Sequence, residues 1–120
     1  MTLLFLTAIG GEMLERDYQR ELIPKIKGLF PKGKCDVMKN NSGYRQGIPD
    51  LTVFLPFFWA WLEVKPSRDA DQEPNQEWYV SWASRACFGA FIYPENEKEV
   101  LDALVQAYQL RRYALDTPQR

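Results

Sequence analysis

The chain contains no histidine, and only two of its 120 residues are cysteine. The absence of histidine excludes histidine general bases, histidine zinc ligands and the Ser-His-Asp triad. Cys35 and Cys87 lie far apart and form no C-x-x-C pair, which excludes a zinc ribbon and a dithiol redox motif. We therefore expect two buried free thiols in a reducing compartment rather than a disulfide.

The sequence also lacks a long apolar run and an excess of charge of one sign. Its apolar N-terminal segment, residues 1–11, is too short to span a bilayer and has no basic flank, so we interpret it as an added strand or packing arm. The formal net charge is -1, and any DNA binding must therefore depend on local patches. Ordinary composition predicts one globular domain over residues 1–120. Because the N-terminal segment resembles neither a signal peptide nor a membrane span, we expect this domain in the cytoplasm and not in a membrane.

Apolar spacing and turn residues give the expected order of elements. Apolar residues at helical spacing predict a helix over residues 12–30, which Pro24 should kink or end. A short strand within residues 34–40 and a turn-rich loop follow. We then expect strands over residues 50–55 and 58–65, a helix over residues 74–87 capped by Gly89, and a strand in AFIYP.

A last helix should begin at a capping box formed by Asn96 and Glu99. Its expected buried stripe is Val100, Leu101, Leu104, Val105 and Tyr108. The complete order is helix, three strands, helix, strand, helix, which predicts an α/β (or α+β) fold with helices flanking a mixed sheet.

The most apolar stretch, GIPDLTVFLPFFWAWLEVKPS, contains charged residues that need an explanation. If the two strands form a hairpin that turns at Pro56-Phe57, Asp50 lies opposite Glu63 on one face of the sheet. Lys65 shares that face by alternation, whereas Leu62 and Val64 point into the core. Two carboxylates this close repel each other unless one is protonated or a cation lies between them.

This arrangement has two interpretations from the residues alone. Two carboxylates and a backbone carbonyl are suitable ligands for Mg²⁺, and Lys65 could orient or deprotonate a water or neutralise a phosphoryl transition state. Alternatively, Glu63 and Lys65 form a structural salt bridge and Asp50 only caps the loop.

Five motifs run in order from about Glu12 to Tyr93: Glu15-x-x-x-Gln19, Asn41-Ser-Gly43, Gly47-Ile-Pro-Asp50, Glu63-Val-Lys65, and Gln76 followed by Trp78. They resemble those of the virus-type replication-repair nuclease (VRR-NUC) family of the restriction-endonuclease-like superfamily, which has a P-D…(D/E)-x-K signature. The E-x-K motif is weak by itself, but the ordered set is specific. The resemblance implies a restriction-endonuclease-like core.

The resemblance also implies a role for each matched residue. Asp50, Glu63 and the Val64 carbonyl would bind Mg²⁺ or Mn²⁺, and Lys65 would be the catalytic lysine. Glu15 resembles the first-helix carboxylate that binds metal directly or through water, although Glu12 lies on the same helix face and competes for this role. Gln76 resembles the glutamine that orients Lys65 or the scissile phosphate, but its position also fits an exposed first-turn residue.

Candidate DNA contacts flank this site. Lys39 and Arg45 are the basic residues nearest to it in sequence, and Gln19, Asn41 and Ser42 belong to the matched motifs. For Asn41, a local turn is an equally good explanation.

The tip of the hairpin, the turn between the two strands, is rich in aromatic residues (FLPFFWAW, residues 54–61). Either these side chains are exposed and mark a surface that binds a partner, or they pack beneath the helices. Stand-alone members of the family resemble Holliday junction resolvases in being homodimers, and the tip and the N-terminal arm could form such an interface.

The expected function is that of a Mg²⁺- or Mn²⁺-dependent DNA endonuclease. The family implies repair-type cleavage of branched DNA by a homodimer, leaving a 5′-phosphate, and a bacterial or phage source. Flap, nicked or single-stranded DNA is the alternative substrate. A non-catalytic DNA-binding or assembly module of the same fold is the alternative class, although the matched acidic positions are all filled.

Overall fold

The computed structural model describes residues 11–41 and 43–117, so residues 1–10 of the predicted N-terminal arm (residues 1–11) and Ser42 lie outside the described residues, and Gly11 begins α2. The described elements follow the predicted order. They are α2 (Gly11–Lys27), β1 (Asp36–Lys39), β2 (Leu51–Leu55), β3 (Phe58–Val64), α3 (Gln76–Ala86), β4 (Gly89–Ile92), the 3₁₀ turn η1 (Pro94–Asn96) and α4 (Glu97–Asp116).

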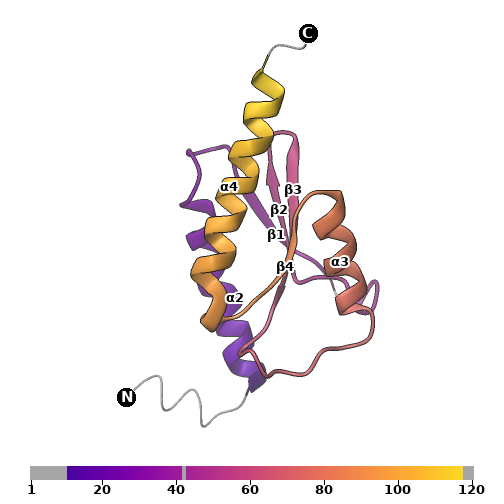
Figure 1. Ribbon diagram of the computed structural model, residues 1–120. Coiled ribbons are helices and arrows are strands. Elements are labelled where there is room, and N and C mark those ends of the chain that lie inside the picture. The colour runs from indigo at the N-terminus through magenta and orange to yellow at the C-terminus, as the bar shows by residue number, and fades with distance from the viewer. Residues whose placement is uncertain (1–10, 42, 118–120) are drawn as a thin grey trace.

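The four strands form one mixed sheet in the order β1-β2-β3-β4. β1, β2 and β3 pair antiparallel, whereas β4 returns after α3 and pairs parallel to β3. Helices α2 and α4 lie together on one face of the sheet, and α3 lies on the other (Figure 1). The predicted α/β class with helices on both faces of a mixed sheet is therefore confirmed.

The main core lies between the sheet and the pair α2 and α4. Alternate residues of β2 and β3 point into it because side chains alternate along a strand, and Leu62 and Val64 are fully buried as predicted. The helices contribute Leu22 and Ile26 from α2 and, from α4, the predicted stripe around Leu104. The other face of β3 is covered by α3.

The hairpin register is the predicted one. Leu55 pairs with Phe58 and Leu51 with Leu62, which brings Asp50, just before β2, level with Glu63. The two-residue turn is tight, and Phe57 adopts a left-handed conformation with φ 57°. This turn fixes which residues of the two strands face each other.

Two local predictions need correction. Gly89 does not cap α3, which ends at Ala86 with Cys87 as the capping residue. Gly89 instead starts β4, and glycine is needed there because a Cβ would lie 2.5 Å from the carbonyl oxygen of Val80. Asn96 precedes α4 but its side chain does not cap it. That side chain instead accepts a hydrogen bond from the Tyr93 backbone N–H (2.9 Å) and stabilises the turn η1.

The cysteines and Pro24 follow the predictions in part. Cys35 and Cys87 are both free thiols, as predicted, but they are half-buried rather than fully buried. Pro24 lies inside α2, which ends three residues later at Lys27. Among the helices of the described residues, none is long and apolar enough to cross a bilayer.

Candidate active site

Asp50 and Glu63 meet at the end of β3 on the face that α3 covers. The backbone N–H of Val64 donates a hydrogen bond to Asp50 Oδ2 (2.8 Å). The backbone N–H of Asp50 donates to Glu63 Oε1 (3.2 Å). The hairpin therefore holds the two carboxyl groups against each other, as the sequence predicted, and these reciprocal backbone contacts lock their positions.

Lys65 and Gln76 complete this buried group. The Lys65 ammonium lies 2.7 Å from Gln76 Oε1, 2.9 Å from the Asp71 carbonyl oxygen and 3.6 Å from Glu63 Oε2. The Gln76 side-chain amide donates a short hydrogen bond to Glu63 Oε2. Glu63, Lys65 and Gln76 are 1%, 7% and 6% exposed, so Gln76 is not an exposed first-turn residue.

The Glu63–Lys65 salt bridge considered in the sequence analysis is present, but it is only one contact within the group. Lys65 is closer to Gln76 and to the Asp71 carbonyl than to Glu63. Asp50 faces the same group and does not merely cap the loop. The side chains predicted to converge (Asp50, Glu63, Lys65 and Gln76) are therefore brought together.

The electrostatics of the pair favour a proton or a cation between the carboxyl groups. Burial, followed by the charge of Asp50, raises the pKa of Glu63 to about 9. Burial also raises the pKa of Asp50, although the hydrogen bond from the Val64 N–H opposes the shift. The buried Glu63 and the half-buried Asp50 have one ammonium beside them, so their negative charge would be incompletely balanced if both were ionised.

This donor chemistry fits a hard divalent cation. Carboxylate oxygens are the ligands that Mg²⁺ prefers, and a cation beside Asp50 and Glu63 would relieve the cost that raises their pKa values. In the part of the chain that the structure describes, no three acidic or thiol side chains gather closely enough to hold a metal ion together. A cation beside Asp50 and Glu63 would need further oxygen ligands, for which the Val64 carbonyl, water and the nearby Glu15 carboxylate are the candidates.

The first-helix residues lie beside this pair. Glu15 is near enough for its charge to raise the pKa of Glu63. Glu15, Arg16, Gln19 and Lys39 line a recess of about 240 Å³ between α2 and the end of β1. The fold thus groups Glu15 with two of the predicted DNA contacts, Gln19 and Lys39. The Glu12 side chain lies outside the described residues.

The loop before Asp50 packs against the start of α3. Gly47 has φ 85°, and a Cβ there would lie 2.3 Å from the Pro74 carbonyl oxygen, so only glycine allows this approach. Arg45 extends from this loop, its guanidinium lies over the Tyr44 ring (5.9 Å from the centroid), and its interaction with Tyr79 of α3 raises its pKa. This close packing keeps Asp50 and Gln76 on one side of the sheet.

Asn41 has the turn role considered in the sequence analysis. Its Oδ1 accepts a hydrogen bond from the Gly43 N–H (2.9 Å), and its carbonyl oxygen accepts one from the Tyr44 N–H (3.1 Å). The side chain is exposed, and the turn accounts for it without a ligand.

Two supports of the site were missed by sequence reasoning. Asn40 donates hydrogen bonds to the Pro49 carbonyl oxygen and to the Thr52 hydroxyl (2.8 Å each), which ties β1 to the loop that carries Asp50. The Asp71 carbonyl binds Lys65 through its backbone and leaves no signal in the residue type. The only signal for Asn40 was a polar residue directly after a strand.

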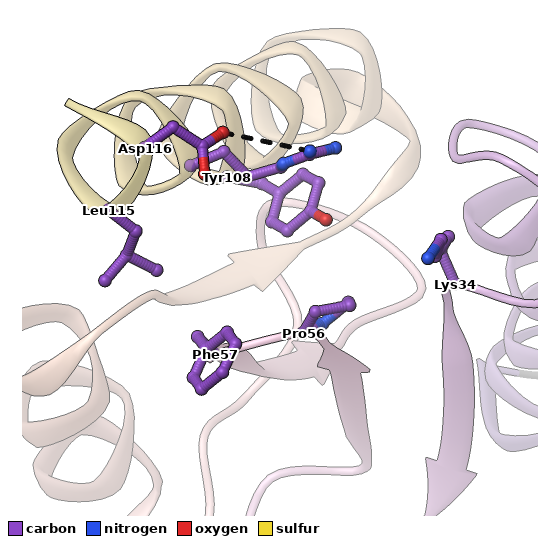
Figure 2. A pocket seen from close by; sticks show the side chains of 7 residues that line it. Lys34, Pro56, Phe57, Tyr108, Leu115 and Asp116 are labelled. Carbon is purple, nitrogen blue, oxygen red and sulfur yellow. Dashed lines mark ion pairs between the residues drawn. The ribbon is translucent and has the colours of Figure 1, made fainter.

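The hairpin tip lies at the other end of β2 and β3. Phe57 is 79% exposed, whereas Phe58 is buried against the Tyr108 ring. A groove of about 450 Å³ separates the tip from the last turns of α4 (Figure 2), where Phe57 and Pro56 face Tyr108, Leu115 and Asp116. The aromatic residues of the hairpin are therefore divided between an exposed tip and packed positions.

Comparisons of this chain with family models, curated proteins and solved structures found no significant match.

Proposed function

We propose that this protein is a Mg²⁺- or Mn²⁺-dependent DNA endonuclease with a restriction-endonuclease-like core of the VRR-NUC type. The observation that supports the proposal best is the buried group of Asp50, Glu63, Lys65 and Gln76. A structural salt bridge needs one carboxylate and one ammonium, but this site pairs two carboxyl groups and raises both of their pKa values. Burial of that kind is costly and is typical of functional sites.

Each residue of the site would have a distinct role in phosphodiester hydrolysis. Asp50, Glu63 and the Val64 carbonyl would hold the cation, with Glu15 contributing directly or through water. The cation would supply Lewis-acid stabilisation of a phosphoryl oxygen and lower the pKa of a water. The Lys65 ammonium would orient the attacking water or offset charge on the phosphorane, leaving a 5′-phosphate and a 3′-hydroxyl.

Gln76 would act as a positioning residue. Its amide nitrogen contacts Glu63 and its amide oxygen contacts Lys65, so one planar group fixes the Glu63 carboxyl relative to the Lys65 ammonium. Its own oxygen also accepts a hydrogen bond from the Glu73 N–H (2.8 Å), which ties the side chain to the loop before α3.

Lys39, Arg45 and Gln19 would contact DNA phosphates at the rim of the site, with Ser42 as a further candidate on the motif. The near-neutral net charge predicts modest affinity and a shallow dependence on salt, which suits recognition of a branched shape better than tight binding to linear duplex. Branched DNA is therefore the proposed substrate, with flap, nicked or single-stranded DNA as the alternative.

We also propose a homodimer through the hairpin tip. The exposed Phe57 and the groove beside it offer apolar surface at the end of the molecule away from the site. Light scattering tests this at micromolar concentration, with Phe57→Asn as the variant because asparagine tolerates the left-handed turn. The dimer is supported if the wild type has about twice the chain mass of 14.0 kDa and Phe57→Asn has the mass of one chain. It is refuted if the wild type itself has the mass of one chain.

The central experiment measures cleavage of labelled four-way junctions, flaps and linear duplex with Mg²⁺ and with EDTA. We expect metal-dependent cleavage by the wild type and a loss of at least about 100-fold for Lys65→Ala, because removing a transition-state contact typically costs that much. Equal cleavage by both proteins would refute the site. Junction binding without cleavage under any metal condition would favour the non-catalytic binding module.

A further inference from the structure

An aromatic surface extends from the proposed active site across the same side of the sheet. Helix α3 lies over β3 and β4 and leaves this face of β1 and β2 without a covering helix among the described residues (Figure 1). The surface, here called the aromatic face, consists of Tyr44, Phe54, Trp59, Trp61, Trp78 and Trp82.

Rings from two elements beside the site form one continuous group, with Trp59 and Trp61 from β3 and Trp78, Tyr79 and Trp82 from α3. Trp61 contacts Tyr79 and Trp82 at centroid distances of 5.8 Å, and Trp59 contacts Trp82 at 5.7 Å. Trp61 also donates its indole N–H to the Thr52 hydroxyl (2.9 Å), so this ring is fixed in place. The rings of the aromatic face that β3 contributes, Trp59 and Trp61, are therefore held rigidly.

The outermost rings are the most exposed and lie nearest to the site in sequence. Tyr44 is 78% exposed on the loop before Asp50, and Trp78 is 59% exposed two residues after Gln76. Trp78 meets Tyr79 edge to face at 86°, a contact that leaves much of its ring surface open to solvent. Trp61 precedes Glu63 by two residues on the same strand face, which corresponds to about 6.6 Å.

A cation lies at the active-site end of the aromatic face. The Arg45 guanidinium lies over the Tyr44 ring and pairs with no carboxylate within 4.0 Å among the described residues. Lys39 pairs with the core residue Leu51 and lines the recess beside α2, so it lies on the other face of the sheet. The acidic Asp36 lies at the far end, and Lys27 pairs with it at 3.7 Å. A second copy of this chain would bring the same cation to the surface, whereas a phosphate backbone brings the opposite charge.

We propose that the aromatic face binds an unpaired strand of nucleic acid, whose bases stack on Tyr44, Trp78 and Trp82 while its phosphates pass Arg45 toward Asp50 and Glu63. This inference rests on the proposed nuclease function and narrows its substrate to DNA with unpaired nucleotides beside the scissile phosphate. Base stacking on aromatic side chains needs exposed ring surface and does not depend on base identity. The bases of a continuous duplex are stacked on one another inside the double helix, so they cannot stack on these rings.

The test separates binding from cleavage. Fluorescence anisotropy in EDTA measures the affinity of the full-length protein for a labelled 15-nucleotide oligothymidine and for a hairpin duplex of equal length. We expect the wild type to prefer the single strand. The double variant Trp78→Ala/Trp82→Ala should bind it at least tenfold more weakly, since each stacked base contributes about 1–3 kcal/mol. Trp78→Phe should retain most of the affinity.

A matched control is Tyr113→Ala, which removes an exposed aromatic ring from the end of α4, and it should change affinity less than twofold. Because Trp82 also packs against Trp59 and Trp61, the single variant Trp78→Ala, which removes a mostly exposed ring, is measured as well and should lose about fivefold or more. Unchanged single-strand affinity in Trp78→Ala and the double variant would overturn the inference. So would a wild-type preference for duplex, or a dimer that Trp82→Ala dissociates.

The failures of the two proposals can be told apart. If Lys65→Ala and the wild type bind the single strand equally, and no metal condition gives cleavage, the aromatic face is supported and the nuclease proposal fails. Suppose instead that the wild type cleaves DNA, and that Trp78→Ala/Trp82→Ala equals it in both cleavage and single-strand binding. The nuclease proposal then survives, and the aromatic face does not bind the substrate.

Discussion

The Lys65 ammonium donates a hydrogen bond to the side-chain oxygen of Gln76, 2.7 Å away, in the buried group between β3 and α3. These residues belong to different elements, and α3 starts at Gln76 itself. The contact therefore joins the end of a strand to the first turn of a helix, and the nitrogen of the same amide holds Glu63. One glutamine positions both charged groups.

Gln76→Ala should lower metal-dependent cleavage about 10- to 100-fold, because partners that orient ligands typically contribute that much. Gln76→Glu should be worse, since a third carboxylate beside Glu63 loses the amide donor and adds repulsion. Cleavage rates measured at saturating Mg²⁺ check this, with the exposed Gln106→Ala as control. Wild-type rates in Gln76→Ala would contradict the positioning role.

Glu63 should make the metal-free protein less stable as pH rises. Its folded-state pKa of about 9 lies above the ordinary glutamate pKa of 4.5, so between these pH values the folded state holds a proton that the unfolded chain releases. Stability is then greatest below pH 4.5 and falls as pH rises toward 9. In EDTA at pH 8, Glu63→Gln should stabilise the fold by on the order of 2–4 kcal/mol and should flatten this dependence.

Urea denaturation at pH 5 and pH 8 measures the difference. Glu99→Gln is the control because Glu99 is an exposed carboxylate of α4. Equal pH dependence in wild type and Glu63→Gln would show that Glu63 does not hold the proton.

Mg²⁺ should stabilise the wild type and not Asp50→Asn. Binding to the folded state at about ten times the dissociation constant contributes about 1.4 kcal/mol, which corresponds to a shift of a few degrees in Tm. Thermal melts at pH 8 are compared in EDTA and in about 10 mM Mg²⁺, which is roughly ten times the dissociation constant of a millimolar site. Asp102→Asn, on the surface of α4, should respond like the wild type; an equal response from Asp50→Asn would move the cation elsewhere.

Gly47→Ala should destabilise the protein by about 2–4 kcal/mol, because a left-handed alanine and a backbone clash add together. Gly33→Ala is a matched control: Gly33 has a similar φ of 82°, but its added Cβ meets nothing within 4 Å. It should cost only about 1 kcal/mol. Denaturant midpoints compare the two, and equal losses would mean that the loop does not press on the start of α3.

The sequence by itself determined the order of elements and the pairing of Asp50 with Glu63. Both follow from local physics: apolar periodicity selects helix or strand, and a two-residue turn sets the register of the strands on either side of it. Alternation along β3 then places Lys65 on the face of Glu63. Local rules failed at Gly89 and Asn96, where packing of β4 on α3 and the turn η1 decided the role of each residue.

Only the tertiary structure decided what surrounds those charges. Gln76 reaches Glu63 and Lys65 because the parallel return to β4 carries α3 over this face, and a residue thirteen positions from Glu63 has no local signal for that contact. Burial, and with it the raised pKa of Glu63, likewise depends on which helix covers the strand. Which aromatic residues of the hairpin are packed was also decided by long-range packing: Phe58 lies against Tyr108 of α4, whereas Phe54, on the sheet face that α3 leaves open, stays exposed.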